Sequence, residues 1–108
     1  MAQYLVQVAY TPEAIASLVK NPQNRLSVIS EAIEKLGGKM TNGWLSFGDF
    51  DTAVLLELPN NVAAAAFALS IGGGGACKSV KTTPLLSVEE GIEAMKAAAT
   101  TGYKPPAV

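Results

Sequence analysis

Residues 52–58, TAVLLEL, constrain the fold most, because they are apolar at nearly every position. A strand with one face in water alternates apolar and polar residues, whereas a strand buried on both faces is apolar throughout. We therefore expect this segment to be a strand that is covered on both faces.

Three further segments are typical of strands. Residues 3–10, QYLVQVAY, alternate with period two and are rich in β-branched and aromatic residues. Residues 39–47, KMTNGWLSF, alternate as well, and the glycine-containing stretch 48–51, GDFD, suits a hairpin into residues 52–58. Residues 77–83, CKSVKTT, are polar and predict a weak strand at a sheet edge.

Helix signals separate these strands. Thr11 and Pro12 are typical of an N-cap followed by the first helical residue. Pro22 predicts a break near Asn21, after which the helical pattern resumes and ends at the glycine pair 37–38.

Two more helices are expected towards the C-terminus. A helix rich in alanine should begin after Pro59, with Asn60 or Asn61 as its N-cap. Ser87 and Glu90 have the spacing of a capping box, which opens a last helix through about residue 99.

The order β-α-β-β-α-β predicts an α+β, ferredoxin-like fold with a four-stranded antiparallel sheet and two helices on one face. The added C-terminal helix would span about 87–100. At 108 residues the chain is expected to form one domain, 1–108, with a core of about 3–86 and a tail at 101–108.

The composition limits the classes of partner and the compartment that can be expected for this chain. Hydrophobic residues make up 49% of the chain and charged residues only 16%, which indicates more apolar surface than a small monomer can cover and favours a homo-oligomer. The net charge of −1 and the lack of a basic run argue against nucleic acid and anionic membranes. A single cysteine, with no signal-like N-terminus or membrane-length apolar run, favours the cytoplasm.

The chain has no histidine, which excludes a Ser-His-Asp or Cys-His mechanism within one chain. The commonest protein ligand of metals is also absent, and we predict neither a metal site nor a cofactor. The lone thiol, Cys77, is expected to be a small buried or edge residue rather than a nucleophile.

The stretch 72–79, GGGGACKS, resembles a phosphate-binding loop, but Cys77 stands where that pattern requires its second glycine. A phosphate loop leads from a strand into a helix N-terminus, whereas here a helix enters the glycines and a strand leaves them. We therefore interpret Gly72–Gly75 as a helix-to-strand turn. The run has more glycine than a turn needs, so it could also be a mobile flap beside a pocket or pack closely against a second subunit.

Several features in order resemble the GYD-domain family, small bacterial proteins named for a glycine, a tyrosine and an aspartate. The features cover roughly residues 4–90. They are Tyr10-Thr11 before the first helix, Leu36-Gly37-Gly38 before the second strand, the hairpin Gly48-Asp49-Phe50-Asp51, and the alanine-rich helix from Pro59 to Leu69.

The resemblance implies a ferredoxin-like fold close to the dimeric α/β-barrel group, in which two sheets pair face to face. It implies no established reaction. The family motif falls on Gly48, Phe50 and Asp51, and Phe50 stands in place of the tyrosine, so any role of that hydroxyl is lost. The glycine run is also longer than the small-residue turn of the family.

The alternation of the strands assigns side chains to the two faces of the sheet. The helix-facing side is expected to hold Tyr4, Val6, Val8, Leu45, Phe47, Val54, Leu56 and Leu58. The opposite face is expected to hold Leu5, Gln7, Ala9, Asn42, Trp44, Ser46, Leu55 and Glu57. Its apolar members would form an exposed patch, which predicts that a second subunit covers it.

The polar and aromatic members of that face, Gln7, Asn42, Trp44, Ser46 and Glu57, are candidates for binding a small molecule. Glu57 is the one acid expected mid-strand, and burial beside Trp44 would make it a weak candidate for a general acid or base. The alternative is a structural ion pair with a lysine such as Lys81, which we favour.

The acids of the hairpin, Asp49 and Asp51, could be read as paired carboxylates or a cation site. Aspartates in hairpins more commonly accept hydrogen bonds from backbone N–H groups, and we favour that role.

The favoured hypothesis is a non-catalytic homo-oligomer that binds a small molecule at its sheet face. The alternative is a cofactor-independent enzyme of the dimeric α/β-barrel kind, with Glu57 as its acid or base, acting on a small aromatic or keto compound. A third class, a regulatory module that docks on another protein, remains open from the sequence.

Overall fold

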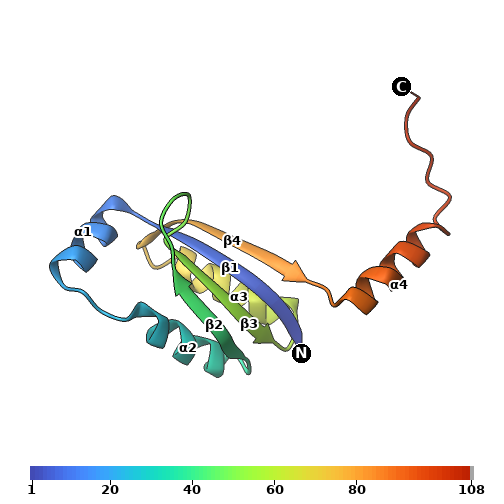
Figure 1. Cartoon of the computed structure of the whole chain (residues 1–108). Coiled ribbons are helices and arrows are strands. Elements are labelled where there is room, and N and C mark those ends of the chain that lie inside the picture. The colour runs from blue at the N-terminus through green and yellow to red at the C-terminus, as the bar shows by residue number, and fades with distance from the viewer. Residues whose placement is uncertain (108) are drawn as a thin grey trace.

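The computed structural model describes residues 1–107; the last residue of the predicted tail, Val108, lies outside them. Within this part the chain is α+β, with four strands and four helices (Figure 1). The elements are β1 (Ala2–Tyr10), α1 (Pro12–Lys20), α2 (Arg25–Lys35), β2 (Lys39–Leu45), β3 (Thr52–Leu58), α3 (Asn61–Gly72), β4 (Cys77–Leu85) and α4 (Val88–Ala98).

The strands form a single antiparallel sheet in the order β2-β3-β1-β4. β3 and β1 are the interior strands. The expectation that residues 52–58 are covered on both faces is met on one face only, because the side chains turned towards the helices are buried whereas Ala53, Leu55 and Glu57 on the other face are partly exposed. β4 lies at an edge, as its polar sequence predicts.

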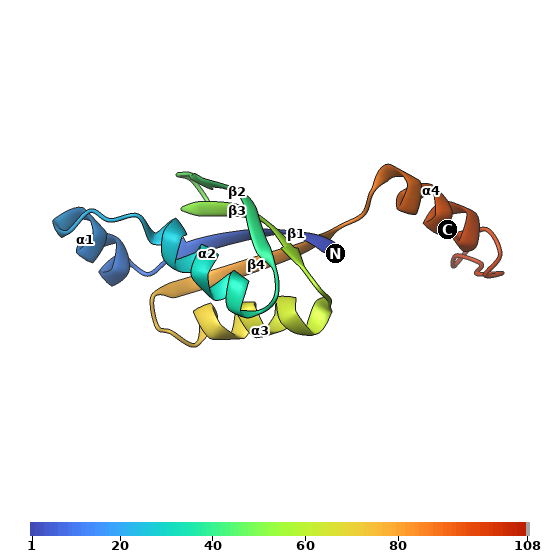
Figure 2. The ribbon, with the colours of Figure 1, turned by 90° about the horizontal axis from the view of Figure 1, so that it is seen from below.

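The core lies on one side of the sheet. Tyr4, Val6 and Val8 of β1 belong to one buried cluster with Ile33 of α2 and Phe67 of α3. In Figure 2, α3 lies below the strands and α2 is drawn in front of β1 and β4. The core is completed by Val54, Leu56, Leu58 and Ala64.

The helix boundaries follow their predicted capping residues. The Thr11 side chain accepts a hydrogen bond from Ala14 N, and the Asn60 side chain accepts one from Ala63 N. The predicted break near Asn21 is confirmed, because α1 ends at Lys20 and α2 begins at Arg25.

A pair of glycines ends α2 and leads into β2. Gly37 adopts a positive φ of 84°, its N–H bonds to Glu34 O, and the N–H of Gly38 bonds to Ile33 O. This is the Schellman arrangement, in which the left-handed residue is most easily a glycine. The sequence prediction is confirmed here together with its physical reason.

Two hydrophobic residues expected in the core are exposed instead. β2 ends at Leu45 rather than continuing to residue 47, so Phe47 lies in the connecting loop and is 99% exposed. Leu45 is paired with Thr52 in the sheet, yet it is 78% exposed. Alternation alone predicts on which face of the sheet a side chain lies. It does not predict whether a helix extends far enough along the strand to cover that side chain.

α4 lies apart from the rest of the domain. Its capping box is formed as predicted, with Ser87 Oγ accepting from Glu90 N and the Glu90 side chain accepting from Ser87 N. No residue of α4 is buried, and both views show the helix pointing away from the sheet (Figures 1 and 2). No helix of residues 1–107 has the length and apolar character needed to cross a membrane.

Candidate functional site

The face of the sheet opposite α3, here called the open face, is the one seen in Figure 1. The strand register arranges its side chains in rows that run across the sheet. The central row is Thr83–Leu5–Leu55–Asn42. On one side of it lies Lys81–Gln7–Ala53–Trp44, and on the other lies Leu85–Gln3–Glu57–Lys39.

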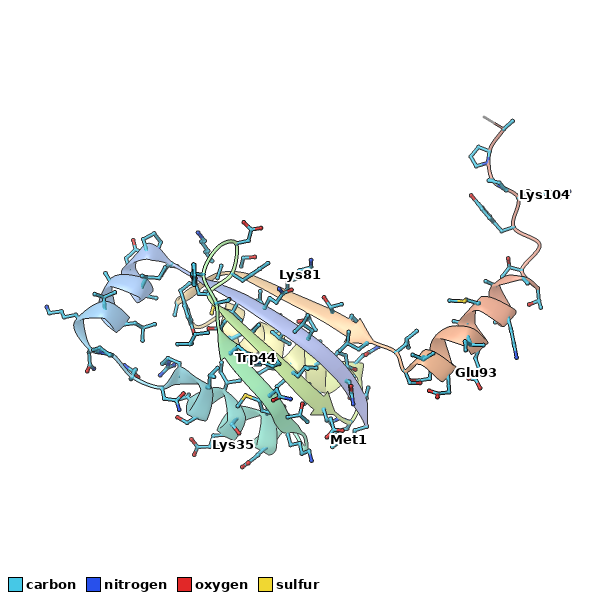
Figure 3. All side chains as sticks on the ribbon, viewed as in Figure 1. Met1, Lys35, Trp44, Lys81, Glu93 and Lys104 are labelled. Carbon is cyan, nitrogen blue, oxygen red and sulfur yellow. The ribbon has the colours of Figure 1, made fainter. Side chains whose placement is uncertain are left out.

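The register places three of the predicted ligand-binding residues in neighbouring rows. Gln7 and Trp44 flank Ala53, and Asn42 pairs with Leu55 in the next row. Trp44 is 50% exposed, and Figure 3 shows it over the strands of the sheet. Ala9 continues the alternation of this face along β1, where it pairs with Ser79 and is buried.

Glu57 does not join this group. It lies four residues along β3 from Ala53, which corresponds to about 13 Å in an extended strand. Its carboxylate is 3.7 Å from the Lys39 ammonium, and its side chain is 27% exposed. The expected ion pair is therefore present, but the partner is Lys39 rather than Lys81, because Lys39 is the residue paired with Glu57 across the sheet. Glu57 is not buried beside Trp44.

Ser46 belongs to the hairpin loop rather than to the open face. Its hydroxyl donates to Phe50 O at 2.8 Å, and its N–H donates to Asp51 O at 2.9 Å. Gly48 has a φ of 132°, so this glycine stands where a side chain would strain the backbone.

Asp51 closes this loop onto β1. Asp51 N donates to Val8 O, and Asp51 Oδ2 accepts from Tyr10 N, both at 2.8 Å. Thr52, completely buried, donates its hydroxyl to Tyr10 Oη at 3.3 Å. Asp51 thus caps a backbone N–H group, as the sequence reading favours.

A cavity of about 460 Å³ lies on the helix side of the sheet, and the sequence analysis assigned no residues to it. Its walls come from β1, α1, the start of α2, the end of α3, the glycine turn and the start of β4. The lining residues are Val8, Tyr10, Ala14, Ser17, Leu18, Gln23, Arg25, Ile29, Ser70, Ile71, Gly74, Ala76 and Cys77. None of the predicted ligand-binding residues is among them.

The glycine run forms part of the wall of this cavity. α3 ends at Gly72 and β4 begins at Cys77, so the run is a helix-to-strand turn, as expected. The N–H of Gly73 bonds to Leu69 O, and Thr11 N bonds to Ala76 O at 2.9 Å. The second bond ties the turn to the beginning of α1. The expectation of a pocket beside the glycines was the only signal in the sequence for this cavity.

Arg25 is the one charged residue in the lining. Burial raises the pKa of the Cys77 thiol, and the positive charge of Arg25 opposes that shift. Cys77 is therefore held as a neutral thiol, which fits the expected small edge residue better than a nucleophile. Among residues 1–107 there is no group of three or more carboxylate or thiol side chains that could hold a metal ion.

Comparisons with known proteins address the family and the fold. A family model described as GYD domain matches residues 4–95. A solved structure, the crystal structure of FFRP-DM1, is similar with a TM-score of 0.50 at 12% identity, covering 80% of this chain and 100% of that chain. A search of curated proteins gives no match.

Proposed function

This chain belongs to the GYD-domain family, and we propose that it is a ferredoxin-like domain whose subunits associate through the open face into a homo-oligomer. The observation that carries the proposal is the uncovered apolar centre of that face. Leu5 and Leu55 pair with each other in the two interior strands and are only partly buried, and Trp44 stands beside them half exposed.

The composition of the open face fits an interface between proteins. Its apolar centre is bordered by the charged side chains of Lys39, Glu57 and Lys81. An apolar centre with a polar rim is the usual anatomy of such interfaces, and tryptophan is enriched among the residues that dominate their affinity. A contiguous apolar patch on a small domain is rarely left in water.

The shape of the chain supports the same proposal. The radius of gyration is 17.2 Å, whereas a compact domain of this length has about 13 Å. Figure 1 shows α4 and the residues after it extending away from the sheet. α4 carries Val88, Ile92 and Met95 at helical spacing and exposes all three. In an oligomer, α4 would gain a neighbouring subunit to pack against.

The ferredoxin-like assignment rests on the element order and on the core. The strand order β2-β3-β1-β4 follows from two strand-helix-strand units that interleave in one antiparallel sheet. Ile33 of α2 and Phe67 of α3 pack into one cluster, which supports two helices on one face. The departure from the simple form is that α1 and α2 replace a single helix.

Pairing two such sheets face to face would give a dimeric α/β barrel and enclose Gln7, Asn42 and Trp44 between subunits. We propose that a small molecule binds in that space, stacked on Trp44 and hydrogen-bonded to the two amides. Glu57 takes a structural role here, because Lys39 already pairs with its carboxylate. The enzyme alternative therefore gains no support from the arrangement.

Sedimentation velocity of the whole chain tests the assembly. We expect the wild-type protein to sediment as a dimer or larger at micromolar concentration, and Leu55→Lys to sediment near the monomer mass of 11.2 kDa. Val19→Lys, on the 75% exposed position of α1, is the matched control and should assemble as the wild type does. A monomeric wild-type protein would refute the proposal, as would a Leu55→Lys variant that assembles normally.

Native mass spectrometry of the gently purified protein tests the ligand. An oligomer that carries additional mass, lost in Trp44→Ala, is the expected result. Retained mass that survives Trp44→Ala would place the ligand elsewhere.

A further inference from the structure

The cavity between α1, α2 and the glycine turn has the size and lining of a ligand site. Its volume of about 460 Å³ lies in the range of pockets that bind small molecules. It lies on the helix side of the sheet, so it is separate from the open face and belongs to a single subunit. Its walls are mainly aliphatic, from side chains such as Val8, Leu18, Ile29 and Ile71.

The electrostatics of the cavity are one-sided. Arg25 supplies the only charge in the lining, and no acidic residue lines it. Within residues 1–107, the only hydrogen bond from the Arg25 guanidinium goes to Gln23 Oε1 at 3.4 Å, and Arg25 forms no ion pair. Most of its five N–H donors are therefore free for a ligand.

Hydroxyl groups in the lining add hydrogen-bond donors that can rotate to suit a ligand. Tyr10 of β1, Ser17 of α1 and Ser70 of α3 bring hydroxyl groups to the lining. A largely apolar cavity with one guanidinium and three hydroxyls suits a molecule with an apolar body and one anionic head. Guanidinium binds carboxylate in a planar two-bond geometry, which makes a carboxylate the head that fits best.

We propose that this cavity is a binding site for a small carboxylate with an apolar body, held by Arg25. The glycine turn forms one wall and is fixed to the start of α1 by the bond from Thr11 N to Ala76 O. The four residues before Ala76 are glycines 72–75, so this wall of the cavity has the backbone freedom to adapt to its ligand.

The experiment is a titration of the whole isotope-labelled chain, followed by amide NMR, with sodium octanoate and with its neutral isostere octanamide. Octanoate should give saturable shifts at the amides of Ala14, Ile71, Gly74 and Ala76, and octanamide should bind more weakly. Shifts centred on Gln7, Asn42 and Leu55, or no saturable shift in the millimolar range, would overturn the proposal.

Two matched pairs of variants test the charge and the cavity separately. Arg25→Gln should weaken octanoate binding about tenfold and leave octanamide unchanged, whereas Lys20→Gln, outside the lining, should change neither. Ala14→Leu fills part of the cavity and should weaken both probes, whereas Ala16→Leu on the same helix should weaken neither. Equal affinities for the two probes, or an Arg25→Gln variant that binds octanoate normally, would refute the carboxylate assignment.

The test is independent of assembly. Sedimentation of the same samples reports whether the open face pairs, and neither outcome there changes the expected octanoate shifts. Loss of octanoate binding in Leu55→Lys with Ala14 and Gly74 amides otherwise unperturbed would contradict a site contained within one subunit.

Discussion

The carboxylate of Asp51 accepts a hydrogen bond from the backbone N–H of Tyr10 at 2.8 Å, across 41 residues of sequence. The ladder between β1 and β4 shifts register at Ala9 and Tyr10, where β1 turns towards α1. Asp51 supplies the partner that the Tyr10 N–H needs there. Asp51 thus joins the hairpin to the end of β1.

Replacing Asp51 should lower the free energy of unfolding, and the loss should be larger when the variant removes the hydrogen-bond acceptor altogether. We expect Asp51→Ala to lower the free energy of unfolding by about 1.5–3 kcal/mol, because a half-buried N–H loses a charged acceptor. Asp51→Asn keeps an acceptor oxygen and should cost less than half as much. Urea denaturation measures both variants, and equal losses would contradict a hydrogen-bonding role.

Gly38 should tolerate no side chain. A Cβ at this position would collide with the carbonyl oxygen of Glu57 and lie 2.7 Å from Leu58 Cδ2. Because the first obstacle is backbone, β2 and β3 must separate to admit it, and we expect Gly38→Ala to lower stability by about 2 kcal/mol or more. Gly72→Ala, with open space around the added atom, is the control and should be close to neutral. Thermal denaturation measures the stability of both variants, and equal stabilities would contradict the expected collision at Gly38.

Thr82 offers a stabilising substitution. Its hydroxyl oxygen is buried and has no hydrogen-bond partner among residues 1–107. Thr82→Val keeps the branched shape that suits a strand and removes the unpaired polar atom, so we expect a gain of about 1 kcal/mol. The neighbouring Thr83→Val changes a residue of the open face and serves as the comparison. A loss of stability in Thr82→Val, measured by urea denaturation, would show that the hydroxyl has a partner.

The N-terminus of α4 should respond to acid. The N–H of Ser87 holds the pKa of Glu90 below its ordinary value of 4.5, with the Ser87 hydroxyl group contributing as well. A lowered pKa in the folded state means that the cap is fully formed above about pH 4.5 and is lost as the pH falls through the lower, folded value.

An NMR titration of the Ser87 amide from pH 6 to pH 2.5 follows this change. The amide should shift and lose protection from exchange in the wild-type protein. Glu90→Gln should remove the transition, and Glu89→Gln should keep it. A transition that persists in Glu90→Gln would assign it to another acid.

The local structure could be predicted from sequence where only a few residue types can cap a helix or adopt a particular backbone conformation. Thr11, Asn60 and Ser87 cap helices, and the glycine at 37 takes a positive φ, because few other residues can. These tasks depend on neighbours within four residues, so the local pattern contains the information.

The features that sequence could not predict depend on distant segments. Phe47 is exposed because β2 ends before it, and β2 shifts register between Met40 and Asn42, which periodicity does not reveal. The cavity is formed by five elements that only the fold brings together. The partner of Glu57 follows from strand register, which selects Lys39 over Lys81.

The two edges of the sheet limit how copies of this chain can associate. β4 carries Lys78, Lys81 and Pro84 along its free edge, and β2 is interrupted by its register shift. Lysine, proline and bulges all discourage a further strand from extending a sheet. Growth by strand addition, the route to fibres, is therefore disfavoured at both edges. The face-to-face pairing proposed above would instead use up its own surface once it forms, and would give particles of finite size.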